Sequence, residues 1–371
     1  MTQDQREIIL DGQKLPWHKD RVEAWLNRER IAPITLGWAL TRACNYNCEF
    51  CYSKLQENER EDITQKVIFD FLDDAAEVGV KGISLVSDGE STCSPHLYDA
   101  VLHGKQAGLD MALGTNGRLL KNERFEEILP ALTYLRFNIC AGEPKRYKEI
   151  HGCKEGDFEQ VCEKIEDCVR IKKRNGLETT LGLQMVLLPR YADQIMSLSK
   201  LGKKLGVDYL VIKHCSDDKD GQLGVDYDGY FNISEELKKA EALSTKEYAV
   251  KPKWSKILSG GKRTYTRCYA PPFMSEYSGS GLVTSCGFLF NTQYSKFHVA
   301  NLAEQRFKDI VKSDKYWQLM DYLASQEFNP KTMCGTLCMQ HKVNEYLFAL
   351  KNGEIKLETP LGKPPMHVNF I

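Results

Sequence analysis

The chain has no long apolar segment, almost no net charge and no low-complexity tract. Its 371 residues include 50 Lys and Arg against 51 Asp and Glu, a net charge of −1. A chain with balanced charges has no excess of positive charge to attract nucleic acid or a membrane surface, so neither partner is expected. The polar start 1–7 is unlike a signal peptide, and no apolar run is long enough to span a bilayer. A cytoplasmic protein is therefore expected.

Cysteine, by contrast, is abundant, with 13 residues. The cytosol keeps thiols reduced, so this number favours metal ligation over disulfides, and an odd count excludes complete pairing. The densest group is Cys44-x3-Cys48-x2-Cys51. Three thiolates within eight residues can ligate three corners of a [4Fe–4S] cluster and leave the fourth iron open. The alternative is a zinc knuckle or a chance cluster of buried cysteines, although zinc sites normally close with four ligands.

From about residue 34 the chain alternates short apolar runs with helical patterns. Strands are expected at 34–40, 83–87, 111–115, 135–140, 180–188 and 209–213. Helices are expected at 62–78, 95–107, 122–129, 158–174, 192–205 and 232–243, the first with Asp62 and Gln65 in a capping box. Six such units predict an α/β fold, a parallel sheet curled into a partial (β/α)6 TIM-like barrel. The chemistry of such a sheet lies at the C-terminal strand ends, and the triad directly follows the first strand.

The triad, with Phe50 directly before its third cysteine, resembles the signature of the radical S-adenosylmethionine (SAM) superfamily, whose fold is also a (β/α)6 barrel. The resemblance implies that SAM chelates the open iron through its methionyl amine and carboxylate. It also implies reductive cleavage of SAM to a 5′-deoxyadenosyl radical, which abstracts hydrogen from a C–H bond. An electron donor such as flavodoxin or ferredoxin is then an expected partner, and Phe50 is expected to flank the adenine.

The segment 87–91, Ser-Asp-Gly-Glu-Ser, resembles the Gly-Gly-Glu motif of this family, with Asp88 in the first glycine position. The resemblance implies that Glu90 accepts hydrogen bonds from the ammonium of SAM, while Gly89 allows close approach of the backbone. The alternative is an ordinary βα turn, in which Asp-Gly is common.

Three further positions are expected to contact SAM. Thr115 and Asn116 belong to a Thr-Asn-Gly sequence that resembles the family element near the SAM ribose and amino acid. Asn138 stands where relatives have a SAM-contacting serine. Gln184 interrupts the apolar run 181–188 and needs a polar partner, either SAM or another group of the barrel core.

A second cysteine group comprises Cys268, Cys286, Cys334 and Cys338. It resembles the SPASM/twitch extension, in which a hairpin and a helix hold an auxiliary cluster. Four thiols suit the shorter twitch form with one auxiliary [4Fe–4S] cluster, and a structural zinc ribbon is the alternative. The hairpin is expected near 278–287 and an amphipathic helix near 307–317.

These patterns divide the chain into five expected segments. They are an N-terminal extension (1–33), the radical SAM partial barrel (34–216), a connecting segment (217–262), the twitch-like domain (263–345) and a C-terminal tail (346–371).

The catalytic residue beyond the cofactors is unknown from sequence, and five candidates follow strand ends. Cys93, Cys140 and Cys215 could each donate a hydrogen atom to a substrate radical, although burial in the core is the commoner role of such cysteines. Lys213 and His214 could bind substrate or act as acid and base, although a lone histidine is more often structural.

The sequence therefore predicts a radical SAM enzyme that acts on a small polar substrate, such as a sugar, an aminocyclitol or a nucleotide sugar. Oxidation or epimerisation would follow hydrogen abstraction, and an auxiliary cluster suits oxidation because it can accept the second electron. One alternative is a peptide- or protein-modifying maturase whose leader recognition is supplied in trans, since residues 1–33 are too few for a leader-binding domain. The other is a non-catalytic, metal-bearing binding module.

Overall fold

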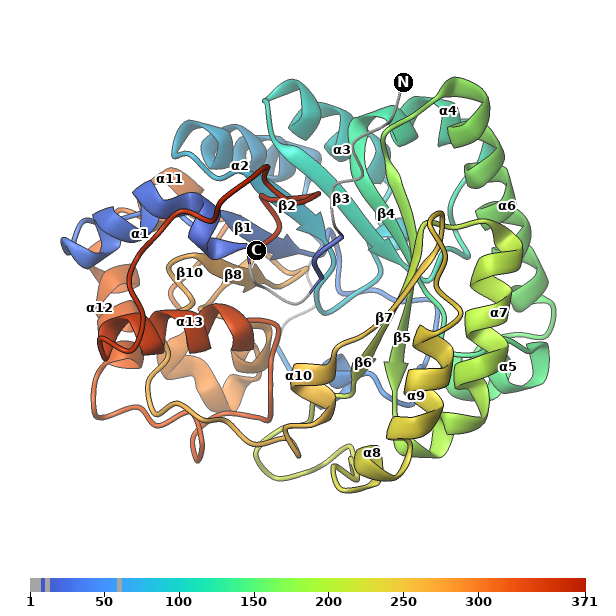
Figure 1. Cartoon of the computed structure of the whole chain (residues 1–371). Coiled ribbons are helices and arrows are strands. Elements are labelled where there is room, and N and C mark those ends of the chain that lie inside the picture. The colour runs from blue at the N-terminus through green and yellow to red at the C-terminus, as the bar shows by residue number, and fades with distance from the viewer. Residues whose placement is uncertain (1–7, 11–13, 59–61) are drawn as a thin grey trace.

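The computed structural model describes residues 8–10, 14–58 and 62–371. Its centre is an eight-stranded sheet in the order β7-β6-β5-β4-β3-β2-β1-β8, in which every neighbouring pair is parallel (Figure 1). The strands are β1 (Thr35–Trp38), β2 (Gly82–Leu85), β3 (Asp110–Thr115), β4 (Leu132–Asn138), β5 (Thr180–Leu187), β6 (Tyr209–His214), β7 (Ala249–Pro252), β8 (Met274–Tyr277), β9 (Leu282–Val283) and β10 (Ala300–Asn301).

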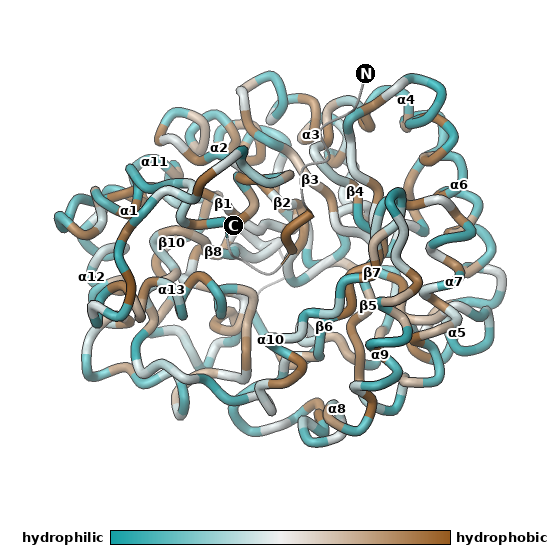
Figure 2. The backbone as a smooth tube through the Cα atoms, viewed as in Figure 1, coloured by the Kyte–Doolittle hydropathy of each residue, from teal (hydrophilic) through white to brown (hydrophobic). Residues whose placement is uncertain are grey.

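Strands β1 to β6 are the six expected from the apolar runs, and the fold class is confirmed. These strands are almost entirely buried, because helices cover one face and the interior of the curled sheet covers the other. Figure 2 shows apolar residues along the strands and more hydrophilic residues on the outer turns.

The helices are α1 (Lys19–Leu26), α2 (Gln65–Glu77), α3 (Leu97–Gln106), α4 (Phe125–Ile128), α5 (Pro144–His151), α6 (Asp157–Asn175), α7 (Ile195–Leu205), α8 (Gly229–Asn232), α9 (Ser234–Glu241), α10 (Trp254–Ile257), α11 (Phe307–Ile310), α12 (Asp314–Ala324) and α13 (His341–Lys351). Short 3₁₀ turns cover Leu15–His18, Tyr52–Leu55, Ser91–Cys93, Asn122–Arg124, Leu129–Ala131, Pro189–Gln194, Gly287–Leu289 and Thr292–Phe297. The patterns at 95–107, 158–174, 192–205 and 232–243 correspond to α3, α6, α7 and α9, whereas α1, α5, α8, α10 and α13 were not expected.

Three local expectations differ from the structure. Helix α2 is capped by Thr64, whose hydroxyl accepts from the Val67 amide, rather than by Asp62. The expected helix 307–317 is two helices, because the Ser313 hydroxyl caps a new N-terminus at α12. The expected hairpin at 278–287 contains only β9, which pairs with the later strand β10.

Two further strands extend the sheet beyond the expected barrel. Strand β7 comes from the segment 217–262 and pairs with β6, and β8 comes from the segment 263–345 and pairs with β1. Neither four-residue strand is a continuous apolar run, so no pattern marked them. Because β8 is hydrogen-bonded to β1, the residues that follow it are anchored to the barrel; the five-segment division stays a prediction.

The auxiliary segment is also held to the outer helices by a charged contact. The Arg306 guanidinium donates two hydrogen bonds to Asp74 of α2, at 2.8 and 2.6 Å. Asp74 is fully buried, so this bidentate pair provides the counter-charge that its carboxylate needs. The Phe307 ring lies 5.0 Å from the Phe71 ring of the same helix.

The last residues of the chain close the N-terminal end of the barrel. The Thr35 hydroxyl donates to the Asn369 carbonyl (2.7 Å), and the Asn369 amide donates to Asp110 (2.8 Å). The Phe370 ring lies 5.0 Å from the Tyr134 ring inside the barrel. Residues 367–371 therefore form a plug at the end opposite the expected chemistry, with the C-terminus close to the strands in Figure 1.

No helix in the described ranges has the length and apolar character needed to cross a membrane.

We expect Phe370→Ala to lower the free energy of unfolding by about 2 kcal/mol, because the substitution opens a void beneath Gly82 and Tyr134 in a half-buried plug. Urea unfolding measures this. The control is Leu361→Ala in the same tail, where the side chain is 99% exposed and the change should stay within about 0.5 kcal/mol. Equal effects for the two variants would contradict the plug.

Candidate active site

The predicted motifs meet at the C-terminal edge of the sheet. The loop that carries Cys44, Cys48 and Cys51 follows β1, the segment 87–91 follows β2, and Asn116 follows β3. Hydrogen bonds join the three: the Glu90 amide donates to the Ala43 carbonyl (2.9 Å), and the Asn116 side chain donates to Asn45 (2.9 Å). These two contacts join residues that are 47 and 71 positions apart in the sequence.

Glu90 is the centre of this arrangement, with its side chain buried. Its Oε1 accepts from the Thr92 amide (3.0 Å), the Thr92 hydroxyl (2.8 Å) and the Thr115 hydroxyl (2.7 Å), and its Oε2 accepts from the Asn116 amide (2.7 Å). A carboxylate has about four lone-pair sites, two on each oxygen, so Oε2 retains capacity for a ligand ammonium. The structure therefore orients Glu90 through Thr115 and Asn116; contact of all three with SAM stays a prediction.

The structure explains why aspartate stands in the first glycine position of the motif. Asp88 forms an ion pair with Arg42, whose Nε lies 2.9 Å from its carboxylate, and accepts hydrogen bonds from the Ser278 hydroxyl (2.6 Å) and the Gly279 amide (2.8 Å). The Asp88 and Arg42 side chains are 2% and 3% exposed, so the pair is a buried ion pair with further hydrogen bonds. It ties the triad loop and the β2 end to the turn that follows β8.

Gly89 is required by packing between protein segments. A Cβ at this position would lie 1.9 Å from the Thr41 carbonyl oxygen, so no side chain fits against the triad loop. The close approach that the motif predicted is therefore made, in this structure, with the triad loop; the approach of Gly89 to SAM stays a prediction.

Inside the barrel, the Gln184 side-chain amide donates to Asn138 Oδ1 (2.8 Å). Gln184 therefore has the protein partner that burial demands, which satisfies one of the two readings of this residue. This hydrogen bond does not use Gln184 Oε1 or Asn138 Nδ2, so both atoms can bind a ligand. Contact of either residue with SAM stays a prediction.

Three charged side chains line the same interior. Arg136 follows Tyr134 on the inward face of β4, Lys213 lies on the inward face of β6, and Glu276 lies beside Gly37. All three retain some exposed surface, whereas the residues on either side of each are buried. The sequence analysis singled out Lys213 and missed Arg136 and Glu276, because a single charge in a short strand carries little signal by itself.

Burial shifts the pKa of two of these groups. It lowers the pKa of Lys213 to about 8, with the positive charge of Arg136 acting in the same direction. It raises the pKa of Glu276 to about 7, with the negative charge of Asp88 adding to the shift and Lys213 opposing it. The interior therefore holds ionisable groups that change charge close to neutral pH.

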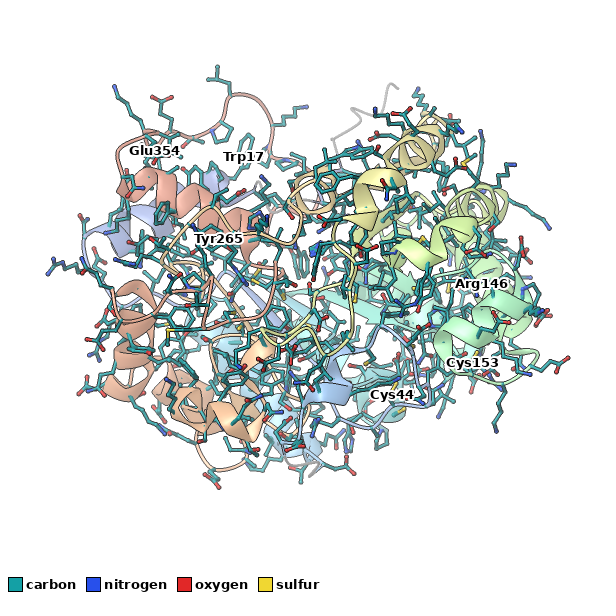
Figure 3. All side chains as sticks on the ribbon, turned by 90° about the horizontal axis from the view of Figure 1, so that it is seen from below. Trp17, Cys44, Arg146, Cys153, Tyr265 and Glu354 are labelled. Atoms are coloured by element: carbon teal, nitrogen blue, oxygen red, sulfur yellow. The ribbon has the colours of Figure 1, made fainter. Side chains whose placement is uncertain are left out.

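The triad thiols differ in their surroundings. Cys44 is exposed, while Cys48 and Cys51 are partly buried (Figure 3 labels Cys44). Cys48 Sγ lies 3.3 Å from His151 Nδ1, and Cys51 Sγ lies 3.0 Å from the Ser53 hydroxyl. His151 was not identified from sequence, because it lies 103 residues from Cys48 in a helix that carried no motif.

The remaining candidates lie in different environments. Cys93 is half-buried, with its Sγ 3.9 Å from Asn45 Oδ1 of the triad loop. Cys140 and Cys215 are fully buried, and burial raises the pKa of each thiol to about 12. His214 alternates with Lys213 on β6, so it faces away from the barrel interior, near the rings of Tyr227 and Tyr230. A catalytic role for these residues stays a prediction.

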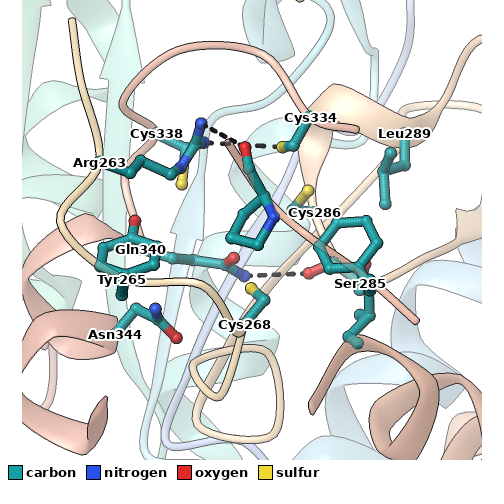
Figure 4. A pocket seen from close by; sticks show the side chains of 13 residues that line it. Arg263, Tyr265, Cys268, Ser285, Cys286, Leu289, Cys334, Cys338, Gln340 and Asn344 are labelled. Carbon is teal, nitrogen blue, oxygen red and sulfur yellow. Dashed lines mark hydrogen bonds between the residues drawn. The ribbon is translucent and has the colours of Figure 1, made fainter. Parts of the chain in front are cut away.

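The four cysteines of the second group line one cavity (Figure 4). Their side chains come from the segments before β8 and after β9 and from the loop that precedes α13. The Gln340 side chain holds the cavity wall by donating to the carbonyls of Met274 (2.5 Å) and Ser285 (3.0 Å). Residues up to 70 positions apart thus place four thiols around a single space.

A buried cation accompanies these thiols. The Arg263 guanidinium donates to Cys334 Sγ (3.6 Å) and to the carbonyls of Pro330 (3.1 Å) and Thr336 (2.5 Å). Burial disfavours its charged form, but the neighbouring Cys334 and Cys338 raise the pKa of Arg263 overall. A fixed positive charge therefore stands beside a site suited to anionic ligands.

In the part of the chain that the structure describes, no three His, Cys, Asp or Glu side chains form a group suited to a single metal ion. In a zinc ribbon all four thiolates bind one ion, whereas in a [4Fe–4S] cluster each thiolate binds a different iron.

The two cysteine groups are connected through direct contacts. The Tyr52 ring, next to Cys51, lies 4.6 Å from the ring of Phe288, two residues after Cys286. The Asn291 side chain also donates to the Leu55 carbonyl (2.6 Å). The triad loop and the auxiliary segment therefore pack as one unit.

We expect Asp88→Gly, which restores the usual glycine of the motif, to lower the free energy of unfolding by about 3 kcal/mol, because it leaves the Arg42 charge buried without its carboxylate. Chemical denaturation of the metal-free chain measures this. Asp73→Asn is the control, since that carboxylate is 55% exposed beside His103 and its loss should cost about 1 kcal/mol or less. A neutral Asp88→Gly would contradict the bridging role.

Known proteins resemble this chain in sequence and in fold. Residues 38–199 match the family model of the radical SAM superfamily. The chain is 26% identical over 295 residues to the AdoMet-dependent heme synthase of Methanosarcina barkeri, which covers 75% of this chain and 82% of that protein. It is 26% identical over 180 residues to the tungsten-containing aldehyde ferredoxin oxidoreductase cofactor-modifying protein of Pyrococcus furiosus, covering 47% of this chain and 49% of that protein.

Solved structures of similar fold include SuiB of Streptococcus suis bound to S-adenosylmethionine, with a TM-score of 0.63 and 16% identity over 82% of this chain and 72% of that one. Native anSMEcpe with bound AdoMet has a TM-score of 0.56 and 13% identity over 88% of this chain and 98% of that one. At these identities the likeness concerns the fold.

The matched residues contain the cysteine triad, Glu90, Thr115, Asn116, Asn138 and Gln184, on the parallel sheet that this family shares. Residues 38–199 therefore form a domain of the radical SAM superfamily, whose members use SAM and a [4Fe–4S] cluster.

Proposed function

We propose that this enzyme binds a [4Fe–4S] cluster at Cys44, Cys48 and Cys51 and abstracts hydrogen from a small polar substrate inside the barrel. The observation that carries the proposal is the hydrogen-bonded unit of the triad loop, Glu90 and Asn116 at the C-terminal strand ends. When bound, the cluster supplies one electron for reductive cleavage of SAM, and the 5′-deoxyadenosyl radical removes hydrogen from the substrate.

The residues around the triad have distinct tasks in this proposal. Glu90 Oε2 accepts a hydrogen bond from the SAM ammonium, and the bonds from Thr92 and Thr115 hold the carboxylate in place for it. Asn138 and Gln184 present their unused amide groups to SAM from the inner face of the sheet. Phe50 flanks the adenine.

The charges of the interior support a polar substrate. Arg136, Lys213 and Glu276 lie on inward faces and retain exposed surface, whereas an apolar substrate would leave these charges desolvated without partners. Two cations suit a phosphate group, so among sugars, aminocyclitols and nucleotide sugars the nucleotide sugar fits best.

The second cysteine group is assigned to one auxiliary [4Fe–4S] cluster in a twitch-like extension. Four thiols around one cavity match the four irons of such a cluster, so each iron has a protein ligand and none is open to substrate. The Arg263 charge stabilises the anionic thiolates. This cluster accepts the second electron of the substrate radical, and the reaction is then an oxidation rather than an epimerisation.

A peptide- or protein-modifying maturase is the second candidate. It is favoured by the solved neighbours, because SuiB was determined with its precursor peptide SuiA and anSMEcpe with bound peptides. Deuterium transfer into 5′-deoxyadenosine from a labelled nucleotide sugar or from a labelled peptide distinguishes the two. The match to an enzyme superfamily argues against the third hypothesis, a non-catalytic binding module.

The triple variant Cys44→Ala/Cys48→Ala/Cys51→Ala should abolish reductive cleavage of SAM and leave about half of the iron bound, because the auxiliary cluster is separate. Iron analysis and chromatography of 5′-deoxyadenosine after anaerobic reconstitution measure both. The control replaces Cys162, a partly buried cysteine of α6 far from either group in sequence, with Ala. Wild-type cleavage by the triple variant would refute the assignment.

Replacing Cys268 and Cys286 with Ala should remove the other half of the iron and stop turnover of substrate. Formation of 5′-deoxyadenosine without substrate should persist, because cleavage depends only on the triad. Parallel assays of iron content, 5′-deoxyadenosine and product measure these effects. A variant that still converts substrate at the wild-type rate would exclude the electron-accepting role, and zinc at this site would exclude the cluster.

A further inference from the structure

His151, the last residue of α5, connects the triad to the barrel core. Its side chain is 1% exposed, with Nδ1 lying 3.3 Å from Cys48 Sγ. Its other ring nitrogen, Nε2, accepts a hydrogen bond from the Cys140 backbone amide at 3.0 Å. The ring therefore has one polar partner on each nitrogen.

These partners determine where the imidazole carries its proton. A backbone amide can only donate, so Nε2 must be the acceptor. An imidazole whose Nε2 accepts a hydrogen bond has no hydrogen on that nitrogen, so the ring carries its single N–H on the other one. That hydrogen is on Nδ1, which therefore donates to the Cys48 sulfur.

The surrounding contacts hold this donor rigidly against the triad loop. The amides of Asn47 and Glu49 donate to the carbonyls of His151 (3.2 Å) and Ile150 (2.9 Å). The His151 ring lies 4.3 Å from the Tyr147 ring. The loop and the C-terminus of α5 therefore move together, so the N–H···S contact is preserved.

The Cys48 sulfur is distinguished in this way from the other two. Cys51 faces the hydroxyl of Ser53 in the 3₁₀ turn Tyr52–Leu55, and a hydroxyl hydrogen can turn about its C–O bond toward another acceptor. Among the residues that the structure describes, the donor to a triad sulfur that comes from outside the triad loop and belongs to an aromatic ring is the imidazole of His151. The His151 imidazole cannot turn away from Cys48 as a hydroxyl hydrogen can, because the Cys140 amide holds the other side of the ring.

We propose that His151 is a positioning residue that raises the reduction potential of the triad cluster through a hydrogen bond from Nδ1–H to the Cys48 thiolate. This inference rests on the proposed cluster site. A hydrogen bond to a ligating sulfur withdraws negative charge from the cluster, and the reduced cluster, which carries one more electron, benefits most. His151 thereby makes the triad cluster easier to reduce by its electron donor, the step that precedes electron transfer to SAM in every turnover.

Two substitutions separate the two hydrogen bonds of the ring. In His151→Gln the side-chain oxygen reaches the position of Nε2 and preserves the acceptor for Cys140, but no donor remains at Nδ1. In His151→Asn the side-chain amide nitrogen occupies the position of Nδ1 and preserves the donor to Cys48. The reconstituted full chain is titrated anaerobically while the cluster signal that changes on addition of SAM is followed by electron paramagnetic resonance.

His151→Gln should lower the ratio of reduced to oxidised triad cluster about tenfold at a fixed potential, which is 59 mV for one electron. His151→Asn should remain close to the wild type, and His103→Gln, on the outer helix α3, should titrate as the wild type. Wild-type iron content in the Gln variant together with the shifted ratio supports the proposal.

An unchanged ratio in His151→Gln, or equal shifts in the Gln and Asn variants, would overturn it. Loss of iron in both variants would assign His151 to structure alone and overturn it as well. A wild-type chain without any SAM-responsive signal would instead overturn the proposed function, and this inference with it.

Discussion

A single buried carboxylate organises the catalytic edge of this enzyme. Glu90 accepts hydrogen bonds from Thr92, Thr115 and Asn116, so it joins the ends of β2 and β3. Asn116 in turn donates to Asn45 inside the triad loop. A buried carboxylate is stable only when such donors surround it. The position of the triad relative to the SAM motif therefore depends on Glu90 keeping all of these partners.

A second buried charge extends this organisation to the auxiliary segment. Asp88 joins Arg42 of the triad loop to Ser278 and Gly279, directly after β8. Strand β8 is itself hydrogen-bonded to β1, so backbone pairing and an ion pair act at the same junction. The departure from glycine at position 88 thus has a structural reason. It connects the two groups of cysteines, whose cooperation the proposed oxidation requires.

Patterns that are local in the chain were predictable. The six apolar strands, the triad and the turn motifs each lie within a few residues, and parallel strands bring their C-terminal ends to one edge. Strand β8 and the charges of Arg136 and Glu276 were not found, because short strands and single charges carry little signal alone. Helix α5 was also missed, and with it His151, whose role depends on contacts with Cys48 and Cys140.

The sequence alone determined the radical SAM character of the chain and its partial-barrel fold, because cysteine spacing and strand periodicity are properties of neighbouring residues. Only the tertiary structure decided which groups surround the two groups of cysteines. It placed four distant thiols around one cavity, Arg263 beside them, and His151 against Cys48. Hydrogen bonds and charge act over a few ångströms in space, and residues 103 positions apart reach that distance only through folding.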